Sequence, residues 1–307
     1  MLNLALVTAA EWPHGKTFTA LYNGVFDPET GKPTQVADPR LKNARIIKIW
    51  DANRAAAEEL AKTRRIETVL DRYEDAAEGV DGVIIADDCT QQHQKFAPDF
   101  IDRKIPLYVD KPLSRKYTEA KQIIDRVKEK GGLFQSGSSI RYANEVLALK
   151  GSLKDKVGKP LLASVFGPNE LIFYGVHSLE LLLGVVEDRV ATVQHLGTET
   201  LDLVLLKFES GLIATWMCGE GTARGAWRFI IRGDKGEAEI TTVTDFYANM
   251  MARFVNMIET GQPPLSLDDT LHVIAILDTA QKSVESGGKE LKVPQPDKQK
   301  SKGRKKK

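Results

Sequence analysis

The sequence predicts an α/β protein with an N-terminal Rossmann-type doubly wound parallel sheet and a C-terminal α/β domain with a mostly antiparallel open sheet. In the first half, short apolar runs alternate with helical patterns, as in the βα units of a parallel sheet. After Tyr142, strand patterns follow one another with hairpin signals such as Glu209–Gly211. We therefore expect domains at residues 1–140 and 141–296, followed by a basic, disordered tail at 297–307.

The expected strands of the N-terminal domain are short runs in which apolar residues predominate, and the Val-Ile-Ile centre of the third is typical of a strand buried on both faces. These runs are Leu4–Val7, Ala44–Trp50, Gly82–Ala86, Ile105–Val109 and Leu133–Ser136. Helices are expected at Arg54–Lys62, Gln94–Arg103 and Tyr117–Lys130. A polar insertion, Gly24–Pro33, follows the first strand and is expected to form a surface loop.

The C-terminal domain combines strands of alternating or β-branched character with helices that bracket them. The strands are expected at Leu161–Phe166, Ala191–His195, Leu201–Phe208, Leu212–Cys218, Trp227–Arg232 and Glu237–Thr242. The helices are expected at His177–Leu183, Phe246–Glu259 and Leu267–Glu285, with a turn at Gly261–Pro264 between the last two. A parallel α/β half followed by an antiparallel sheet with helices is typical of a two-domain enzyme whose active site lies in the cleft between the domains.

Composition excludes several functional classes. A chain of 307 residues with 42% hydrophobic content is long enough for two folded domains. Only Cys89 and Cys218 are present, which indicates neither a disulfide framework nor a zinc site and favours the cytoplasm. Seven basic groups lie in the last ten residues, and without them the formal charge falls from +1 to −6. Because no apolar run approaches the roughly 20 residues of a membrane helix, we expect a soluble protein without nucleic-acid or membrane partners.

Asp110-Lys111-Pro112 is the strongest chemical signal, because it follows the apolar run Ile105–Val109. Ligands bind at the carboxyl ends of the strands in an open α/β sheet. A lysine there can donate a hydrogen bond to a substrate hydroxyl or carbonyl and stabilise charge during hydride transfer, with its ammonium held by Asp110 or neighbouring dipoles. The alternative is a surface turn, since Asp, Lys and Pro are all common in turns.

The loop after the first strand is where a dinucleotide pyrophosphate would bind, but it lacks the G-x-G-x-x-G fingerprint. Three small residues still permit close approach of the backbone: Thr8, Ala9 and Ala10. His14 or Lys16 would supply positive charge. The alternative is that Pro13–Gly15 merely forms a turn.

The end of the second strand carries the residues that would choose between NAD and NADP. Asp51 ends this strand, and its carboxylate can accept hydrogen bonds from the adenine ribose hydroxyls. Arg54 lies three residues on and would instead meet a 2′-phosphate. Because a carboxylate repels that phosphate, we expect NAD or NADP as the cofactor, with NAD slightly preferred.

Together these motifs resemble the Gfo/Idh/MocA oxidoreductases, the family of glucose-fructose oxidoreductase and inositol dehydrogenase. The segments that carry the resemblance are Asp110-Lys111-Pro112, the strand Val83–Ala86 leading to His93, Tyr174–Glu180, Phe246–Phe254 and Gly261–Asp269. It covers nearly the whole chain, up to about Val293. It implies an NAD(P)-binding Rossmann domain, a carbohydrate-like substrate, and a second domain whose open sheet forms a homodimer or homotetramer.

The resemblance also implies roles for three catalytic candidates. Lys111 matches the family's active-site lysine, beside the cofactor, and His177 matches the histidine that takes a proton from the substrate hydroxyl. Phe173 stands where many members carry an aspartate, so His177 is expected to keep its ordinary pKa of about 6.5. Tyr174 is expected to orient substrate or relay a proton. The alternative is that His177 has no catalytic role and is a buried residue of a helix turn whose hydrogen bonds are made within the protein.

Further site residues follow from position alone. Thr90 and His93, in the loop after the third strand, are expected on the nicotinamide side. A metal site built on His93 and two aspartates before it is the disfavoured alternative, and we expect no metal. Arg141 and Tyr142, where the first domain ends, are expected to line the substrate pocket.

Three functions fit these residues. The first is a nicotinamide-dependent dehydrogenase or reductase acting on the CH-OH group of a sugar, sugar acid or cyclitol. The second is a sugar lyase or glycosidase that retains NAD and oxidises its substrate only transiently. The third is a non-catalytic sugar or nucleotide sensor on the same fold.

Overall fold

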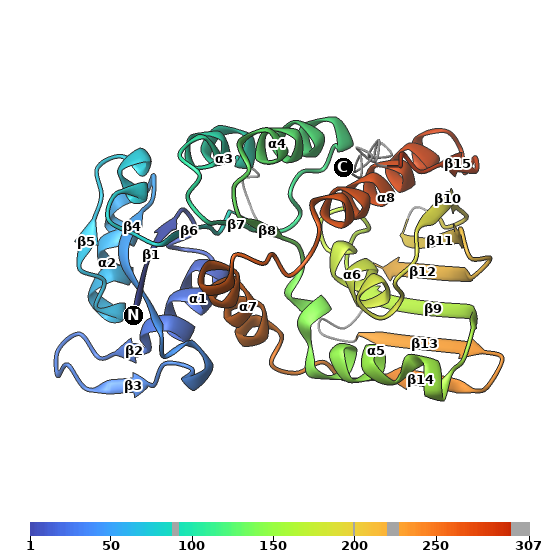
Figure 1. The fold of residues 1–307 in the computed structure, drawn as a ribbon, viewed down its shortest axis with the longest axis horizontal. Helices are drawn as coiled ribbons and strands as arrows, with labels where there is room; N and C mark the ends of the chain where they lie inside the picture. Colours follow the sequence, from blue (N-terminus) through green and yellow to red (C-terminus); the bar gives the residue numbers. More distant parts are fainter. Residues whose placement is uncertain (88–91, 199, 220–226, 296–307) are drawn as a thin grey trace, which may run out of the picture.

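A six-stranded parallel sheet forms the core of the N-terminal domain in the computed structural model, which describes residues 1–87, 92–198, 200–219 and 227–295 (Figure 1). Its strands are β1 (Leu2–Val7), β4 (Ala44–Trp50), β5 (Thr68–Val69), β6 (Gly82–Ile85), β7 (Leu107–Val109) and β8 (Phe134–Ser136). They lie in the order β5-β4-β1-β6-β7-β8, and all neighbouring pairs are parallel. The strand order reverses between β1 and β6, and in such sheets ligands bind at this reversal.

Helices cover both faces of this sheet, which confirms the doubly wound prediction. On one face, α3 (His93–Asp102) and α4 (Tyr117–Lys130) share an apolar core with Val83. On the other, α1 (Pro13–Asn23), α2 (Arg54–Arg64) and α7 (Phe246–Thr260) share a core with Ile84. Val83 and Ile84 point to opposite faces because side chains alternate along a strand.

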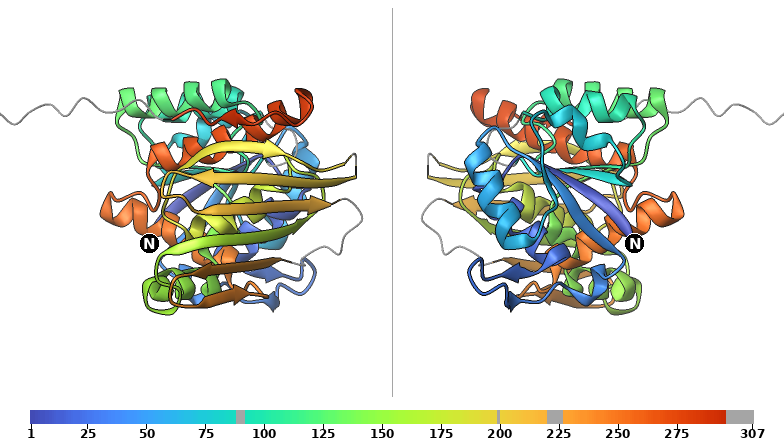
Figure 2. Two further views of the ribbon diagram at one scale, coloured as in Figure 1. Left: turned by 90° about the vertical axis from the view of Figure 1, so that its right-hand side faces the viewer. Right: turned by 90° about the vertical axis from the view of Figure 1, so that its left-hand side faces the viewer.

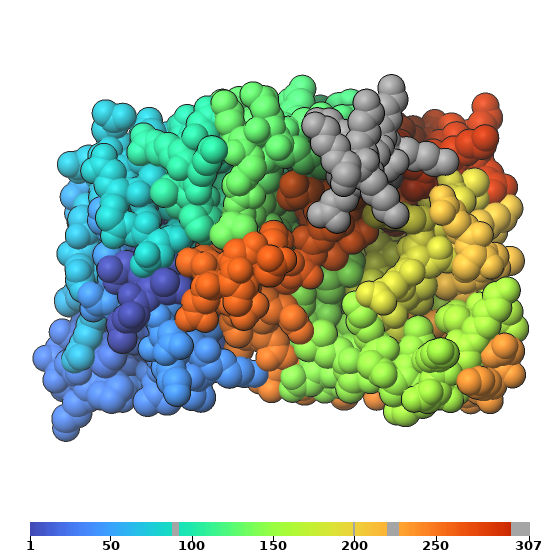
Figure 3. Space-filling model, viewed as in Figure 1, coloured from blue at the N-terminus to red at the C-terminus, as the bar shows by residue number. Residues whose placement is uncertain are grey.

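Helix α7 follows most of the second sheet in sequence but packs on the first domain. The hydroxyl of Tyr22 in α1 donates a hydrogen bond to the carbonyl of Met251 in α7 at 3.3 Å. In the space-filling view the orange residues of α7 lie against the blue N-terminal part of the chain (Figure 3). The chain therefore crosses between the domains at η3 (Ser139–Tyr142), at residues 241–245 and at residues 261–266.

The second domain is built on a seven-stranded sheet in the order β14-β13-β9-β12-β11-β10-β15. Its strands are β9 (Pro160–Pro168), β10 (Val190–His195), β11 (Leu201–Phe208), β12 (Ile213–Gly219), β13 (Arg228–Gly233), β14 (Glu237–Ile240) and β15 (Leu291–Lys292). Only the pair β9 and β12 is parallel, so the prediction of a mostly antiparallel sheet is confirmed. One face is covered by α5 (Asn144–Lys156), α6 (Val176–Val185) and α8 (Leu267–Glu285) (Figure 1).

Two helices are absent from the sequence prediction. Pro13–Gly15 opens α1 instead of forming an isolated turn, because proline suits the first position of a helix and His14, Phe18 and Tyr22 place a buried residue every four positions. Helix α5 was missed because Gly151 lies in its interior and its pattern of buried residues is sparse.

The polar insertion is not wholly irregular. Within and just after Gly24–Pro33, the short strand β2 (Val25–Phe26) pairs antiparallel with β3 (Pro33–Gln35). The remaining 3-10 helices are η1 (Pro39–Leu41) and η2 (Tyr73–Ala77). Within the described ranges, none of the helices has the length and apolar character needed to cross a membrane.

Candidate active site

Lys111 lies at the carboxyl edge of the parallel sheet, directly after β7, and points toward the second domain. Its side chain is buried, with 2% relative exposure, so the surface-turn interpretation is wrong. The Nζ atom lies 4.7 Å from the ring centroid of Phe173 and 5.8 Å from that of Tyr174, both on the segment before α6. An ammonium group over an aromatic face is attracted to it. The two domains therefore meet at this lysine.

Asp110 anchors the motif through its carboxylate. One oxygen, Oδ1, accepts hydrogen bonds from the Lys111 backbone N–H at 2.8 Å and from the Tyr108 hydroxyl at 3.1 Å. The other, Oδ2, lies 2.5 Å from Nδ1 of His14. Burial by itself raises the pKa of Asp110, but the charges of His14 and Lys111 outweigh it and hold the pKa below its ordinary value. Asp110 therefore carries its negative charge inside the protein.

His14 connects this carboxylate to helix α7. Its Nε2 atom lies 2.9 Å from the hydroxyl of Tyr247. Both ring nitrogens of His14 thus face protein groups, Asp110 on one side and Tyr247 on the other. The structure places His14 on the buried side of α1, against Asp110, and its expected contact with a phosphate stays a prediction.

His177, in the first turn of α6, is the second titratable group at the domain boundary. Its Nδ1 atom lies 2.6 Å from Oγ of Ser138, a residue that the sequence analysis did not single out for a role. When Nδ1 donates its proton to this oxygen, Nε2 carries the lone pair that a general base requires. Burial, Lys111 and His14 lower the pKa of His177 well below its ordinary value, so the imidazole is neutral at pH 7.

Aromatic rings surround His177. Its ring lies 5.0 Å from that of Tyr174 and 5.6 Å from that of Trp227, and the last two are stacked 5.9 Å apart at 13°. Trp227 is buried, so its first role is packing against Tyr174. Phe173, which replaces the aspartate of many proteins in the family that the sequence resembles, has the Lys111 ammonium over its ring. No carboxylate among the described residues is hydrogen-bonded to His177.

The described contacts of Arg141 and Tyr142 are with groups other than Lys111 and His177. Arg141 Nε donates to the carboxylate of Glu180, and its Nη1 donates to the carbonyl of Leu183 at 3.1 Å. Burial by itself lowers the pKa of Arg141, but the charge of Glu180 outweighs it and raises the pKa above its ordinary value. Tyr142 is buried in the core shared with α7, which raises its pKa to about 12. The expected lining of a substrate pocket by these two residues stays a prediction.

The loop between β1 and α1 has the shape of a phosphate-binding turn without the usual glycines. Thr8 and Ala9 adopt left-handed backbone conformations, with φ of 72° and 62°. A Cβ atom on Gly15 would lie 2.0 Å from the carbonyl oxygen of Ala9, so only glycine fits there. This glycine permits the close approach of helix and loop that the third glycine of the fingerprint provides elsewhere. The sequence analysis named Gly15 only as part of a turn.

Two further features of this loop fit a pyrophosphate group. The N-terminus of α1 has no side-chain cap and no acidic residue in its first turn. The Oγ1 atom of Thr8 is buried without a hydrogen-bond partner among the described residues. Free donors at a helix N-terminus and an unpaired hydroxyl are what a phosphate oxygen can use.

Asp51 lies at the same edge of the sheet, after β4. Its Oδ2 atom accepts a hydrogen bond from the backbone N–H of Ala10 at 2.8 Å, which ties the end of β4 to the loop between β1 and α1. Arg54 is held outside this loop by two carboxylates, Glu58 at 2.8 Å and Asp71 at 2.5 Å. The structure thus brings Asp51, and not Arg54, to Thr8, Ala9 and Ala10.

The loop after β6 is described only in part, and Thr90 lies outside the described residues. His93 is buried at the start of α3, and its Nδ1 donates to the carbonyl of Leu113 at 3.0 Å. Its Nε2 atom has no partner in the part of the chain that the structure describes. Within that part, no three His, Cys, Asp or Glu side chains come together as a metal site would require.

Comparisons with known proteins agree with this architecture. Residues 24–138 match the family model described as "Oxidoreductase family, NAD-binding Rossmann fold", which confirms the resemblance to the Gfo/Idh/MocA proteins in that part of the chain. No curated protein sequence matches the chain.

Solved structures share the fold at low sequence identity. Myo-inositol 2-dehydrogenase from Lactobacillus plantarum is 17% identical with a TM-score of 0.78, covering 95% of this chain and 99% of that one. Scyllo-inositol dehydrogenase from Lactobacillus casei, solved with NAD(H) and scyllo-inositol, is 14% identical with a TM-score of 0.79, covering 95% and 99%. Myo-inositol dehydrogenase from the same organism, solved with NAD(H) and myo-inositol, is 16% identical with a TM-score of 0.79, covering 97% and 98%. The two-domain arrangement is thus shared over almost the whole length.

Proposed function

We propose that this chain is a nicotinamide-dependent oxidoreductase acting on a CH-OH group of a sugar, sugar acid or cyclitol. The observation that carries the proposal is the meeting of Lys111 and His177 on the ring of Tyr174, beside the edge of the sheet that fits a dinucleotide. A match to an NAD-binding oxidoreductase family over residues 24–138 and a fold shared with inositol dehydrogenases support it.

Lys111 and His177 have different roles at the substrate oxygen. When bound, the nicotinamide accepts or returns the hydride. Lys111 donates a hydrogen bond to the substrate oxygen and stabilises the negative charge that develops there. His177 takes the proton of the hydroxyl in oxidation and returns it in reduction, because its neutral imidazole has a free lone pair. Tyr174 contacts both groups and orients the substrate between them.

Asp110 supports this chemistry without touching the substrate oxygen. Its carboxylate accepts a hydrogen bond from the backbone N–H of Lys111 and thereby fixes the position of the lysine backbone. His14 and Tyr247 hold the carboxylate from the other side. The charge of Asp110 partly balances the ammonium of Lys111 in a buried site, where an unbalanced charge would be costly.

The dinucleotide would be held by Thr8, Ala9 and Ala10 with the N-terminus of α1 at the pyrophosphate, and by Asp51 at the adenine ribose. Because Arg54 is engaged by Glu58 and Asp71, a 2′-phosphate would meet the carboxylate of Asp51 without a neutralising cation from Arg54. We therefore expect NAD to be preferred over NADP.

Titration with both nucleotides, followed by turnover assays with cyclitols, sugars and sugar acids, tests the proposed function. We expect NAD to bind more tightly than NADP and one substrate class to produce NADH, measured by absorbance. Asp51→Ala should lose part of the preference for NAD, whereas Asp81→Ala, at the opposite end of β1, should keep it. Failure of both nucleotides to bind would overturn the proposal. Cofactor retained through purification without net NADH would instead indicate transient oxidation.

We also propose that copies of this chain associate through the outer face of the second sheet. Figure 2 shows this face in its left view with no helix in front of it. Its outward side chains include several exposed apolar residues: Leu162, Phe166, Leu201 and Ile213. The pairing of the strands sets Ile213 beside Leu162 and Met217 beside Phe166, with the hydrogen-bonded pair Ser164 and Thr215 between these two apolar pairs. A surface of this kind on a folded protein favours association with another protein surface.

Phe166→Glu is expected to shift the protein from an oligomer to a monomer, because a carboxylate would be buried without a partner in the apolar interface. Size-exclusion chromatography with light scattering measures the mass. Val36→Glu is the matched control, since Val36 is an exposed apolar residue on the N-terminal domain, far from this sheet. A wild-type protein that is monomeric at micromolar concentration would contradict the proposed association.

A further inference from the structure

Ser138, at the start of the crossing segment η3, contacts helix α6 at two points beside His177. Its Oγ atom lies 2.6 Å from Nδ1 of His177. Its backbone N–H donates a hydrogen bond to Oε1 of Glu180 at 3.2 Å. Glu180 lies three residues after His177, and residues at this spacing are neighbours on the surface of a helix. The two contacts therefore hold Ser138 against one face of α6.

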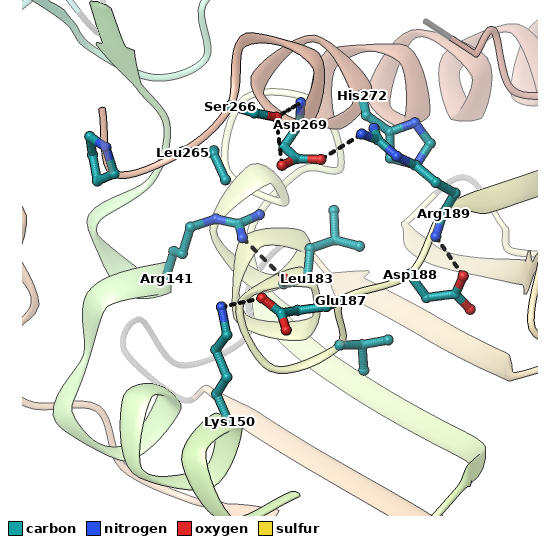
Figure 4. Close-up of a pocket in the computed structure, with 12 residues that line it drawn as sticks. Arg141, Lys150, Leu183, Glu187, Asp188, Arg189, Leu265, Ser266, Asp269 and His272 are labelled. Atoms are coloured by element: carbon teal, nitrogen blue, oxygen red, sulfur yellow. Dashed lines mark hydrogen bonds and ion pairs between the residues drawn. The ribbon is translucent and has the colours of Figure 1, made fainter. Parts of the chain in front are cut away.

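Arg141, from the same crossing segment, neutralises the carboxylate of Glu180. Its Nε donates to Glu180, and its Nη1 donates to the carbonyl of Leu183 on α6 at 3.1 Å (Figure 4). The side chain of Glu180 is 1% exposed, and a buried carboxylate requires a partner of this kind. The ion pair thus fixes Glu180 where its other oxygen accepts the backbone N–H of Ser138.

Gly137 allows the carboxylate to approach the chain this closely. A Cβ atom at this position would lie 2.6 Å from Oε1 of Glu180, and the φ angle of Gly137 is 136°. A larger residue would be strained in that conformation and would collide with the carboxylate. Glycine at position 137 therefore permits the hydrogen bond between Glu180 and Ser138.

The register of the parallel sheet places Ser138 at the same edge as Lys111. Strands β7 and β8 pair with Val109 opposite Ser136. Lys111 and Ser138 each lie two residues beyond this pair, where the carboxyl ends of the strands form the ligand-binding edge. Through Ser138, the edge that carries Lys111 also contacts His177 of the second domain.

We propose that Ser138 and Glu180 are positioning residues for His177, an inference that rests on the function proposed above. The Oγ atom of Ser138 accepts the backbone N–H of Ile140 at 3.2 Å, and a hydroxyl oxygen can accept one further hydrogen bond. The proton on Nδ1 of His177 supplies that bond, so the lone pair of the imidazole lies on Nε2, where the substrate hydroxyl is deprotonated. Glu180 holds the backbone of Ser138 in place for this bond, and neither residue touches the substrate.

Nitrogen NMR of the full-length protein, labelled in the rings of its five histidines, tests Ser138 at pH 7 without turnover. Protonated and unprotonated ring nitrogens give separate signals, and His177→Asn identifies those of His177. We expect the wild-type proton on Nδ1, and signals that move toward each other in Ser138→Ala as both tautomers become populated. In that variant kcat should fall by about tenfold, the effect of about one hydrogen bond, with the KM of the cofactor unchanged. A wild-type proton on Nε2 would overturn the inference.

Ser178→Ala is the matched control for Ser138→Ala. Ser178 follows His177 on α6 and is also fully buried, but its Oγ atom accepts the Nε1–H of Trp216 at 2.8 Å. This variant therefore loses a buried hydrogen bond beside His177 without changing the partner of Nδ1. We expect the wild-type proton position. Equal changes in both serine variants would reduce the effect to the loss of a buried hydroxyl and overturn the role of Ser138.

The double variant Arg141→Met, Glu180→Met tests the carboxylate. Replacing a buried ion pair by apolar residues of similar volume leaves no unpaired charge, so we expect the fold to survive. The backbone N–H of Ser138 loses its acceptor, and the ring signals of His177 should move in the same direction as in Ser138→Ala. The expected fall in kcat is about threefold or more. An unchanged spectrum in this variant would overturn the role of Glu180.

Arg189→Met, Asp269→Met is the control for that double variant. This ion pair of 2.6 Å belongs to the same cavity wall as Arg141 and does not involve Ser138 (Figure 4). We expect the wild-type spectrum of His177. Absence of turnover with every substrate would contradict the proposed function alone, because the proton position in His177 is measured without substrate. Equal shifts of the His177 signals in both double variants would overturn the positioning role of Glu180.

Discussion

Replacing Lys111 with alanine is expected to lower kcat by on the order of 10²- to 10³-fold, the usual effect of removing one group that stabilises developing charge. The Lys111 ammonium group lies between the sheet edge and the ring of Phe173, 4.7 Å from its centroid. Alanine removes the positive charge from the place where the substrate oxygen would become negative. Steady-state rates measure the loss, and circular dichroism measures whether the fold survives.

Lys116→Ala is the matched control for this variant. Lys116 lies five residues further on, but its side chain is 70% exposed and pairs with Glu119 on the surface. Its loss should change kcat by no more than about twofold, because exposed ion pairs contribute little. A folded Lys111→Ala enzyme with near-normal kcat would show that Lys111 takes no part in the reaction. The Asp110-Lys111-Pro112 motif would then have only a structural role.

His177→Asn is expected to slow turnover by on the order of 10²-fold or more, the usual size of general-base catalysis. Asparagine keeps a polar group that can bond to Ser138, but its amide cannot accept the substrate proton. Rates in both directions with the preferred cofactor measure the effect. If His177→Asn retains the wild-type rate, the histidine is a buried structural residue and the proton moves by another route.

The pH dependence of the wild type distinguishes the structure from the expectation based on sequence alone. An ordinary histidine would lose activity in oxidation as the pH falls through about 6.5. Burial, Lys111 and His14 lower the pKa of His177 well below that value, so the neutral form persists at lower pH. We therefore expect no inflection from His177 between about pH 6 and 8.

Phe173→Asp should introduce an inflection from His177 into the pH profile of oxidation. A carboxylate near the site would favour the imidazolium form and raise the pKa of His177, so oxidation would slow as the pH falls. Phe173→Leu removes the ring without adding charge and should leave the profile flat. The same inflection in the double variant Phe173→Asp, His177→Asn would assign the titration to another group.

Much of the architecture follows from the sequence because it depends on local patterns. Runs such as Gly82–Ala86 are apolar at every position and become strands covered on both faces. In the second domain, β11 alternates buried Val204 and Leu206 with outward Leu203 and Leu205, as a strand covered on one face requires. Lys111 could be placed at a strand end for the same reason, since the apolar run stops just before it.

Other features of the candidate site are invisible in local patterns. The bond from His14 to Asp110 joins residues 96 positions apart, and that from His14 to Tyr247 spans 233 positions. Arg141 was expected at the substrate but pairs with Glu180, 39 positions away. A polar residue has several chemically suitable partners in a sequence, and nothing in its neighbours says which of them it will meet.

The sequence by itself determined the two sheets, most of the helices around them, and the positions of Lys111 and His177 near the ends of their elements. Only the tertiary structure decided that Phe173 contacts Lys111, that Ser138 contacts His177, and that burial and nearby charge keep the imidazole neutral. The physical reason is range. Apolar periodicity acts over one turn or one strand, whereas hydrogen bonds and electrostatic shifts depend on which distant groups folding brings within a few ångströms and removes from water.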